Sequence, residues 1–256
     1  MKISVIIPTL NSEKTIGIAV KSAIDKIGEV IVVDSFSKDK TTEIAKREGA
    51  KVIQVKGSRL IARIEGAKSA NGNYIINFDS DMYFSEEVKI EPRKEMVALG
   101  EITVGKGIVH RLMSMDRKIY YEHWKENFDV LLGGIIPRVY KRELLLGVYE
   151  KIPHSLIDKI DIFEDSIIYY EAFKQSYDKE TQFIPNAVYH IEDDTLLHFM
   201  KKWYGYGKNA KLLKSTEYVK LVYSRKGRKG ATLSGRIQLL PVFLVKAIPF
   251  ALGYYF

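Results

Sequence analysis

Short apolar runs alternate with amphipathic stretches over the first eighty positions of the chain. The apolar runs predict four strands, at Ile3 to Ile7, Glu29 to Val33, Lys51 to Val55 and Tyr74 to Phe78. Helices are predicted between them, at Ile16 to Ile27, Thr41 to Glu48 and Leu60 to Ala70. Continuous apolar strands separated by helices indicate a parallel sheet covered on both faces. Right-handed crossovers make this a doubly wound α/β unit.

The helix starts carry local signals of their own. Apolar residues between Ile16 and Ile27 recur every three or four positions, and Asn11 or Ser12 is expected to cap that helix. Asp39 is expected to be the N-cap of the helix that begins near Lys40, an interpretation that we prefer to ligand contact.

The pattern beyond residue 85 predicts fewer elements. Strands are expected at Glu101 to Val109 and Phe183 to His190, and helices at Phe163 to Phe173 and Leu196 to Leu213. No internal repeat or low-complexity linker interrupts the chain. The simplest division is one domain over residues 1–215 and a basic, apolar extension over residues 216–256.

The ends of the four predicted strands locate a candidate site, because ligands of open α/β sheets bind beyond the carboxyl ends of the strands. Three of these ends carry polar groups suited to a ribose, a base or a metal; they are Pro8-Thr9-Leu10-Asn11, Asp34-Ser35-Phe36-Ser37 and Asp79-Ser80-Asp81. The fourth carries Arg59, which suits a phosphate. No Gly-x-Gly-x-x-Gly follows the first strand, which argues against a nicotinamide or flavin dinucleotide.

Asp79 and Asp81 form the strongest local signal. Two carboxylates one residue apart at a strand end repel each other unless a cation neutralises them, and Mg²⁺ and Mn²⁺ prefer carboxylate oxygens. The competing interpretation is a solvated turn with two surface acids. The apolar strand that ends directly on Asp79 favours a metal site.

Composition and charge narrow the class of protein. The 256 residues include no cysteine, which excludes disulfides and thiolate sites and fits a reducing compartment. The first residues enter a strand pattern directly, so we expect no secretory signal. The net charge of +8 is concentrated between Lys201 and Lys229, where ten Lys or Arg stand against one acid, Glu217. Such a segment suits an anionic partner, or it is a solvated face of a lysine-rich protein.

Together these motifs resemble the family 2 glycosyltransferases of the GT-A fold. The resemblance rests on Ile6 to Asn11, Ile31 to Thr41, Ala62-Arg63 with Gly66, Asp79 to Asp81, Phe163 to Asp165, Tyr189-His190 and Trp203 to Gly207. It covers about residues 1–210 and is most specific in the first 85. It implies a GT-A, Rossmann-like, mostly parallel sheet with a C-terminal helical extension.

The resemblance also implies roles for individual residues. Thr9 and Asp34 would contact the nucleoside, and Arg63 would reach toward the donor. Asp79 would touch the ribose or a metal-bound water, while Asp81 would ligate Mn²⁺ or Mg²⁺. With the strand-end residues added, the expected donor-binding set is Pro8, Thr9, Asn11, Asp34, Ser35, Arg59, Arg63, Asp79 and Ser80. The expected metal set is Asp79, Asp81 and His190.

Asp165 would deprotonate the acceptor hydroxyl, and a single base with no covalent nucleophile suggests inversion. Glu164 and Asp165 have an alternative interpretation as acids that favour a helix N-terminus. His190 also has an alternative interpretation, as an ordinary histidine at the end of a strand. Trp203, Tyr204 and Tyr206 have three alternative interpretations: they contact the acceptor, they belong to the core, or they lie at a lipid interface.

Departures from the family pattern leave the donor base open. Ser35 replaces a second acid, Phe36 replaces a small residue and Ile64 stands where Asn is common. The donor is expected to carry uridine or guanosine, although another base is possible, and the acceptor is expected to be a glycan or a polyprenyl-linked molecule. A nucleotidyltransferase and a non-catalytic sugar or nucleic-acid binder are the competing functions. The intact Asp79, Asp81 and Asp165 argue against a binder, and we expect no nucleic-acid partner.

The last stretch of the chain, Leu239 to Phe256, is almost wholly apolar and aromatic. It is shorter than a spanning helix, and Pro241, Lys246 and Pro249 are expected to interrupt it. We expect it to lie in the interface of an anionic membrane with its aromatic end at headgroup depth, on the cytoplasmic face of the cell membrane. The alternative is that it folds back as a core helix or forms an oligomer contact.

Overall fold

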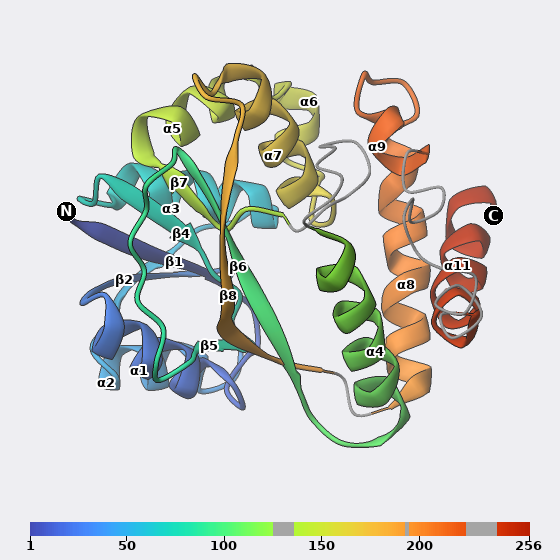
Figure 1. The fold of residues 1–256 in the computed structure, drawn as a ribbon, viewed down its shortest axis with the longest axis horizontal. Coiled ribbons are helices and arrows are strands. Elements are labelled where there is room, and N and C mark those ends of the chain that lie inside the picture. Colours follow the sequence, from blue (N-terminus) through green and yellow to red (C-terminus); the bar gives the residue numbers. More distant parts are fainter. Residues whose placement is uncertain (125–135, 193–194, 224–239) are drawn as a thin grey trace. The chain divides into compact units, whose positions relative to one another are not determined.

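The centre of the fold is a mixed sheet of eight strands in the order β3-β2-β1-β4-β7-β6-β8-β5 (Figure 1). The computed structural model describes residues 1–124, 136–192, 195–223 and 240–256. Its strands are β1 (Ile3–Thr9), β2 (Glu29–Asp34), β3 (Lys51–Gln54), β4 (Tyr74–Asn77), β5 (Met82–Phe84), β6 (Met96–Val104), β7 (Val139–Lys141) and β8 (Thr181–Ile191).

Helices follow most of the strands. They are α1 (Ile16–Lys26), α2 (Thr41–Arg47), α3 (Arg59–Ser69), α4 (Gly107–Trp124), α5 (Arg142–Lys151), α6 (His154–Ile157), α7 (Glu164–Gln175), α8 (Leu196–Ala210), α9 (Val219–Tyr223) and α11 (Leu240–Tyr255). A short 3₁₀ helix, Lys211–Leu213, continues from α8. Within the described ranges, no helix is both long enough and apolar enough to cross a bilayer.

The four N-terminal strands are parallel, as predicted, with β1 between β2 and β4. Val5 and Ile7 of β1 are buried in a core cluster together with residues of α1 and α2. The other face of β1 meets α3, where a Cβ added to Gly66 would lie 2.4 Å from a methyl carbon of Ile6. Helices therefore cover both faces of this part of the sheet, which confirms the doubly wound prediction (Figure 1).

Two of the predicted helix caps are wrong. The N-cap of α1 is Thr15. Ser12 accepts backbone hydrogen bonds from Thr15 and Ile16, but through its carbonyl oxygen rather than its side chain. The N-cap of α2 is Lys40, and Asp39 instead accepts hydrogen bonds from the backbone and hydroxyl of Thr41. Both stretches are loops beside the strand ends, where side chains bond across the loops.

The predicted strand from Glu101 to Val109 is wrong in its second half. The strand β6 ends at Val104, and Gly105 and Gly107 follow with φ of +149° and +84°. These conformations suit glycine and end the extended chain before α4. Val109 and Leu112 of α4 are both buried, and their spacing of three is that of a helix. Ile108 and Val109 therefore belong to the helix and not to the strand. The other predicted elements, at 163–173, 183–190 and 196–213, are α7, β8 and α8 with its 3₁₀ turn.

The chain divides into two compact units. Unit 1 comprises Met1–Glu101 and Ile136–His190, and unit 2 comprises Ile102–Ile135 and Ile191–Phe256. Unit 1 contains the parallel strands with α1, α2, α3, α5 and α7. Unit 2 contains α4, α8, α9 and α11. We expected a catalytic domain over residues 1–215 and an extension over residues 216–256. That division stays a prediction. The end of the basic segment, from residue 224 onward, lies outside the described residues.

The C-terminal segment is a single helix, although Pro241 and Pro249 were expected to interrupt it. Pro241 lies in the first turn of α11, where a missing N–H is tolerated. Pro249 lies inside the helix. The helix packs on α8 with very close backbones, since a Cβ added to Gly207 would lie 2.0 Å from the carbonyl oxygen of Phe250. A Cβ on Gly253 would approach the carbonyl oxygen of Tyr204 equally closely.

Candidate active site

The ends of β1 and β2 form one side of the candidate site. Thr9 and Asp34 are partners in the parallel register, and both are buried. The Asp34 carboxylate accepts hydrogen bonds from the Ser37 backbone N–H at 3.0 Å and from Gln54 Nε2 at 3.1 Å. The Thr9 hydroxyl has no hydrogen-bond partner among the described residues. The structure therefore brings together two of the residues expected to bind the donor nucleoside.

The loops after these strands are joined by side chains. Asn11, with φ of +51°, donates its backbone N–H to Ser37 Oγ and accepts from the Lys38 backbone, each at 2.8 Å. Ser12 and Ser80 share a hydrogen bond of 3.0 Å, which links the β1 loop to the Asp79–Asp81 turn. Pro8 lies within β1, and Ser35 donates its backbone N–H to Thr9. All of these expected site residues lie in unit 1.

Arg63 on α3 is the hub of a cluster of acids. Its guanidinium is fully buried, and Nη2 lies 3.0 Å from Asp79, 3.2 Å from Asp165 and 3.5 Å from Glu164. Burial would lower the pKa of Arg63, but Asp165, Asp79 and Glu164 outweigh it and raise the pKa. An arginine that stays charged in this place holds the strand-end acid and the α7 acids together.

The acids of α7 are presented by an unusual helix start. Phe163, the N-cap, has φ of +73°, a left-handed conformation that is rare for a bulky residue. Glu164 then points inward with 3% of its side chain exposed, whereas Asp165 stays 26% exposed. Burial and the charge of Asp165 raise the pKa of Glu164 to about 7. Asp165 is the accessible member of the pair, as a general base must be.

Arg59, at the start of α3, also faces Glu164, with Nη1 3.7 Å from Oε1 and about half of the side chain exposed. The preceding residue, Ser58, caps the helix by accepting a hydrogen bond from Ile61. Gly57 has φ of +149°. The predicted role of Arg59 on a donor phosphate stays a prediction.

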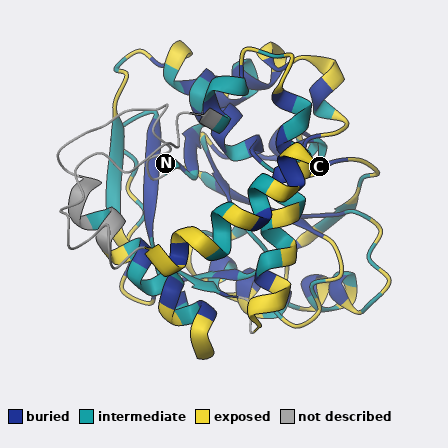
Figure 2. Cartoon of the chain, turned by 90° about the vertical axis from the view of Figure 1, so that its right-hand side faces the viewer, coloured by how far each residue is buried: buried dark blue, intermediate teal, exposed yellow. Residues whose placement is uncertain are grey.

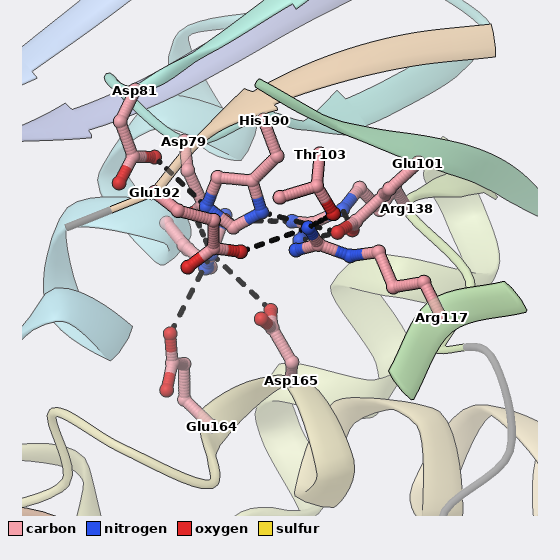
Figure 3. Close-up of polar contacts among 11 residues, drawn as sticks. Asp79, Asp81, Glu101, Thr103, Arg117, Arg138, Glu164, Asp165, His190 and Glu192 are labelled. Carbon is pink, nitrogen blue, oxygen red and sulfur yellow. Dashed lines mark hydrogen bonds and ion pairs between the residues drawn. The ribbon is translucent and has the colours of Figure 1, made fainter. Parts of the chain in front are cut away.

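Two residues of this cluster were missed by the sequence reasoning. Arg138, just before β7, donates from Nη1 to Asp79 Oδ2 at 2.9 Å, and its Nε and Nη2 bind Glu101 of β6 at 3.0 and 2.8 Å (Figure 3). Burial would raise the pKa of Asp79, but Arg138 and Arg63 hold it well below its usual range. The one available signal was Glu101 itself, an acid within the otherwise apolar run of β6.

His190, near the end of β8, connects Glu101 to Asp81. Its Nδ1 lies 3.1 Å from Glu101 Oε2, and its Nε2 lies 3.5 Å from Asp81 Oδ1. Burial would lower the pKa of His190, but the hydrogen bonds to Asp81 and Glu101 raise it to about 9. Met82, which follows Asp81 directly, pairs with His190 where β5 lies against β8. This pairing explains why Asp81 and His190 meet.

The donor set at Asp81 suits a hard cation. Among the described residues, no group of three or more His, Asp or Glu side chains is arranged to hold a metal ion. Mg²⁺ and Mn²⁺ do not require such a group, because they commonly bind one or two protein ligands together with substrate phosphates. Asp81 and His190 face each other and are ligands that Mn²⁺ accepts, whereas both oxygens of Asp79 are engaged by arginines. The residues present therefore fit a cation at Asp81.

Known proteins resemble the chain in sequence and in fold. An uncharacterised glycosyltransferase of Rickettsia typhi is 40% identical over 91 residues, which are 35% of this chain and 31% of the relative. The relative from Rickettsia felis is also 40% identical over 91 residues and is matched over 32% of its length. The matched stretch is thus about a third of these curated relatives.

Two solved structures share the fold. TarS of S. aureus has a TM-score of 0.56 at 20% identity, with 93% of this chain and 47% of that chain covered. Glucosyl-3-phosphoglycerate synthase from Mycobacterium tuberculosis, in complex with Mn²⁺, UDP-glucose and phosphoglyceric acid, has a TM-score of 0.51 at 20% identity. That match covers 91% of this chain and 82% of that chain.

The sequence model for glycosyl transferase family 2 matches residues 4–154, more than half of the chain. This range contains β1 to β4 and the Asp79–Asp81 turn. With its mixed α/β sheet and its acidic strand-end site, the chain has the GT-A fold and belongs to glycosyl transferase family 2.

Proposed function

We propose that this protein is a metal-dependent glycosyltransferase that moves a sugar from a nucleotide-sugar donor to an acceptor hydroxyl or phosphate. One observation carries the proposal: Arg63 Nη2 joins the strand-end acid Asp79 to the helix acid Asp165. A donor-side acid and a candidate base are thereby held at one place. Solved neighbours are in complex with UDP, UDP-GlcNAc and UDP-glucose, which supports a nucleotide-sugar donor.

The nucleoside would bind at the ends of β1 and β2. Thr9 and Asp34 are adjacent there, and the Thr9 hydroxyl, which has no hydrogen-bond partner in the part of the chain that the structure describes, supports a polar contact with the donor. Asp79 remains the candidate for the ribose, and Pro8, Asn11, Ser35 and Ser80 complete the expected donor-binding set. The base is uridine or guanosine in this proposal, with uridine favoured by the neighbours.

Mn²⁺ or Mg²⁺ would be held by Asp81 and His190. When bound, such a cation offsets the negative charge that develops on the leaving nucleoside diphosphate. Arg63 and Arg138 keep Asp79 ionised and oriented beside it. Arg59, half exposed at the start of α3, supplies a further positive charge for the diphosphate.

Asp165 would accept the proton of the acceptor hydroxyl as the new glycosidic bond forms. Its partial exposure and its contact with Arg63 Nη2 at 3.2 Å support this role, since the arginine holds the carboxylate in place. A single exposed base without a covalent nucleophile favours inversion at the anomeric carbon.

Donor hydrolysis tests the proposal. Purified protein is incubated with a panel of UDP- and GDP-sugars, with Mn²⁺, with Mg²⁺ and with chelator. The proposal expects release of nucleoside diphosphate that depends on the cation and on Asp81. Release of pyrophosphate from a nucleoside triphosphate and a sugar phosphate would instead identify a nucleotidyltransferase. Donor binding without any turnover would identify a sugar-binding protein.

The acceptor side of the proposal concerns the membrane. The exposed large side chains of α11 are apolar or aromatic; they are Leu240, Phe243, Leu244, Ile248, Leu252 and Tyr255. Exposed positions recur along this C-terminal helix (Figure 2). The only charge of this helix, Lys246, points inward to Asp116 at 2.8 Å and lies over the Trp203 ring. A face without charge at a helix surface suits the boundary of a bilayer.

Basic residues of unit 2 supply the second signal. Lys201, Lys208 and Lys214 are exposed on α8 and just after it, and Lys214 lies 4.5 Å from the Tyr254 ring centroid. Each lysine near an anionic surface contributes about 1 kcal/mol. We therefore place the protein on the cytoplasmic face of the cell membrane, where a lipid-linked acceptor is accessible.

Sedimentation with vesicles tests this placement. The full chain should pellet with anionic vesicles, less at high salt, and a variant with Ile248→Asp and Leu252→Asp should not pellet. Ile18→Asp, which changes an exposed isoleucine of α1 in unit 1, is the matched control. Protein that stays in the supernatant at low salt refutes the placement. Polyprenyl phosphate in the vesicles should accelerate donor consumption if the acceptor is lipid-linked.

A further inference from the structure

Glu101 binds two separate parts of the site with its two carboxylate oxygens. Oε1 accepts from Nε and Nη2 of Arg138, at 3.0 and 2.8 Å, and Oε2 lies 3.1 Å from Nδ1 of His190 (Figure 3). The side chain is 16% exposed, as is that of His190. Glu101 therefore lies between the residue that holds Asp79 and the residue that faces Asp81.

The chemistry of these contacts is directional. A carboxylate paired with arginine only accepts hydrogen bonds, so the Nδ1 that faces it must carry a proton. Nε2, on the Asp81 side, is then the atom that can ligate a cation once it gives up its proton. A carboxylate on the far nitrogen of a ligating histidine is a common arrangement, which fixes the tautomer and the orientation of the ring.

Arg138 extends the same support to the other acid. It donates to Asp79 Oδ2, whereas Arg63 donates to Asp79 Oδ1. Without Glu101, Arg138 would lose the partner that sets the plane of its guanidinium. One acid on β6 thus contacts both His190 of β8 and Arg138, which precedes β7.

We propose that Glu101 is a positioning residue of the active site, which orients His190 toward a cation at Asp81 and Arg138 toward Asp79. The inference rests on the proposed cation at Asp81. In this proposal Glu101 acts through His190 and Arg138 rather than directly on a substrate or a metal.

Mn²⁺ binding measured by calorimetry or by the electron paramagnetic resonance signal of free Mn²⁺ tests the proposal without any turnover. Glu101→Met keeps the length of the side chain but removes both acceptors, and it should weaken Mn²⁺ binding about 10- to 100-fold. Glu101→Gln keeps one acceptor and should weaken binding less. Glu95→Met is the matched control, because Glu95 binds Lys141 and the Tyr177 backbone at the start of β6, and it should bind Mn²⁺ like the parent.

A double-mutant cycle separates positioning from a general loss of structure. If Glu101 acts on the cation through His190, then Glu101→Met should have no further effect on Mn²⁺ affinity in a His190→Ala background. Equal losses in both backgrounds would overturn the proposal, and so would parent-like binding in Glu101→Met. Thermal unfolding verifies that each variant folds, and Glu101→Gln carries the test if Glu101→Met does not.

Failure of the proposed cation site looks different. If Asp81→Asn binds Mn²⁺ as the parent does, the cation is not at Asp81 and the proposed function loses its metal. If Asp81→Asn abolishes binding while Glu101→Met does not, the cation site stands and the role of Glu101 is refuted.

Discussion

Asp79 and Asp165 share one nitrogen atom of Arg63, at 3.0 and 3.2 Å. The two acids come from distant parts of the chain, one after β4 and the other in the first turn of α7. Because the arginine that joins them is buried, their spacing is set before any donor binds. The donor-side acid and the candidate base are thus preorganised by a residue that solvent does not reach.

Asp165→Asn should reduce turnover by about two to four orders of magnitude, the usual contribution of a positioned general base. Donor binding should be largely kept, because the amide has the same shape. Steady-state turnover and UDP affinity, measured separately, check this. Asp158→Asn removes an exposed acid between α6 and α7 and should leave both quantities unchanged. Unchanged turnover in Asp165→Asn would move the base to Glu164.

Asp81→Ala, like chelation of the parent protein, should reduce donor turnover by at least about 100-fold, because a bound cation stabilises the leaving group by several kcal/mol. The fold should persist, since Asp81 is a partly exposed acid in a turn. Asp25→Ala, an exposed acid of α1, is the control. Normal activity of Asp81→Ala in the presence of chelator would remove the metal from the proposal.

Arg63→Met should lower the free energy of unfolding by about 3–5 kcal/mol, because it removes the buried positive charge that Asp79, Glu164 and Asp165 share. Arg47→Met removes an arginine that pairs with Glu48 but whose own side chain is two-thirds exposed, and it should change stability by less than about 1 kcal/mol. Urea unfolding of the two variants checks the difference. Similar losses of unfolding free energy in both variants would mean that Arg63 orients the acids but contributes little stability.

Stability should depend on pH through Glu164. Its pKa is about 7 in the folded chain, against 4.5 when exposed, so the folded chain keeps a proton that the unfolded chain releases in this window. The free energy of unfolding should therefore fall as the pH rises from about 5 to about 7. Glu164→Gln mimics the neutral acid and should show a flatter dependence in urea unfolding. Parallel curves for variant and parent would contradict the raised pKa.

The contact of α8 with α11 can be tested with two glycines of one helix. Gly207→Ala should destabilise the chain by about 1–3 kcal/mol, because its new Cβ meets the backbone of Phe250. Gly205→Ala has nothing within 4 Å of the added carbon and should be neutral or stabilising, since alanine favours a helix. Thermal unfolding compares them, and equal melting temperatures would refute the close packing of α11.

The parallel half of the fold could be predicted because its information is local. Each strand from β1 to β4 is one apolar run, and its end is marked by a polar residue such as Thr9, Asp34 or Asp79. Parallel strands bring those ends to one edge, so the candidate donor residues followed from topology alone. Arg63 and Asp165 were found through family resemblance, while their contact with each other was not predictable from spacing.

The antiparallel half could not be predicted in the same way. Glu101 and Arg138 meet because β6 and β7 pair in a register that no local pattern determines. The strand at 101–109 was placed five residues too far along the chain, because two apolar residues of α4 continue the run of β6. Lys246 was taken to interrupt an apolar stretch, yet its partner Asp116 lies on α4, far away in sequence.

The two compact units are interleaved along the chain, because each is made of two separate stretches. A single cut therefore cannot release either of them whole, and removing the end of the chain leaves residues 102–135 of unit 2 without the rest of that unit. Deletion mapping is for this reason a poor way to assign activities to this protein. Exchanging the segments 102–135 and 191–256 together with those of a relative is the experiment that respects its architecture.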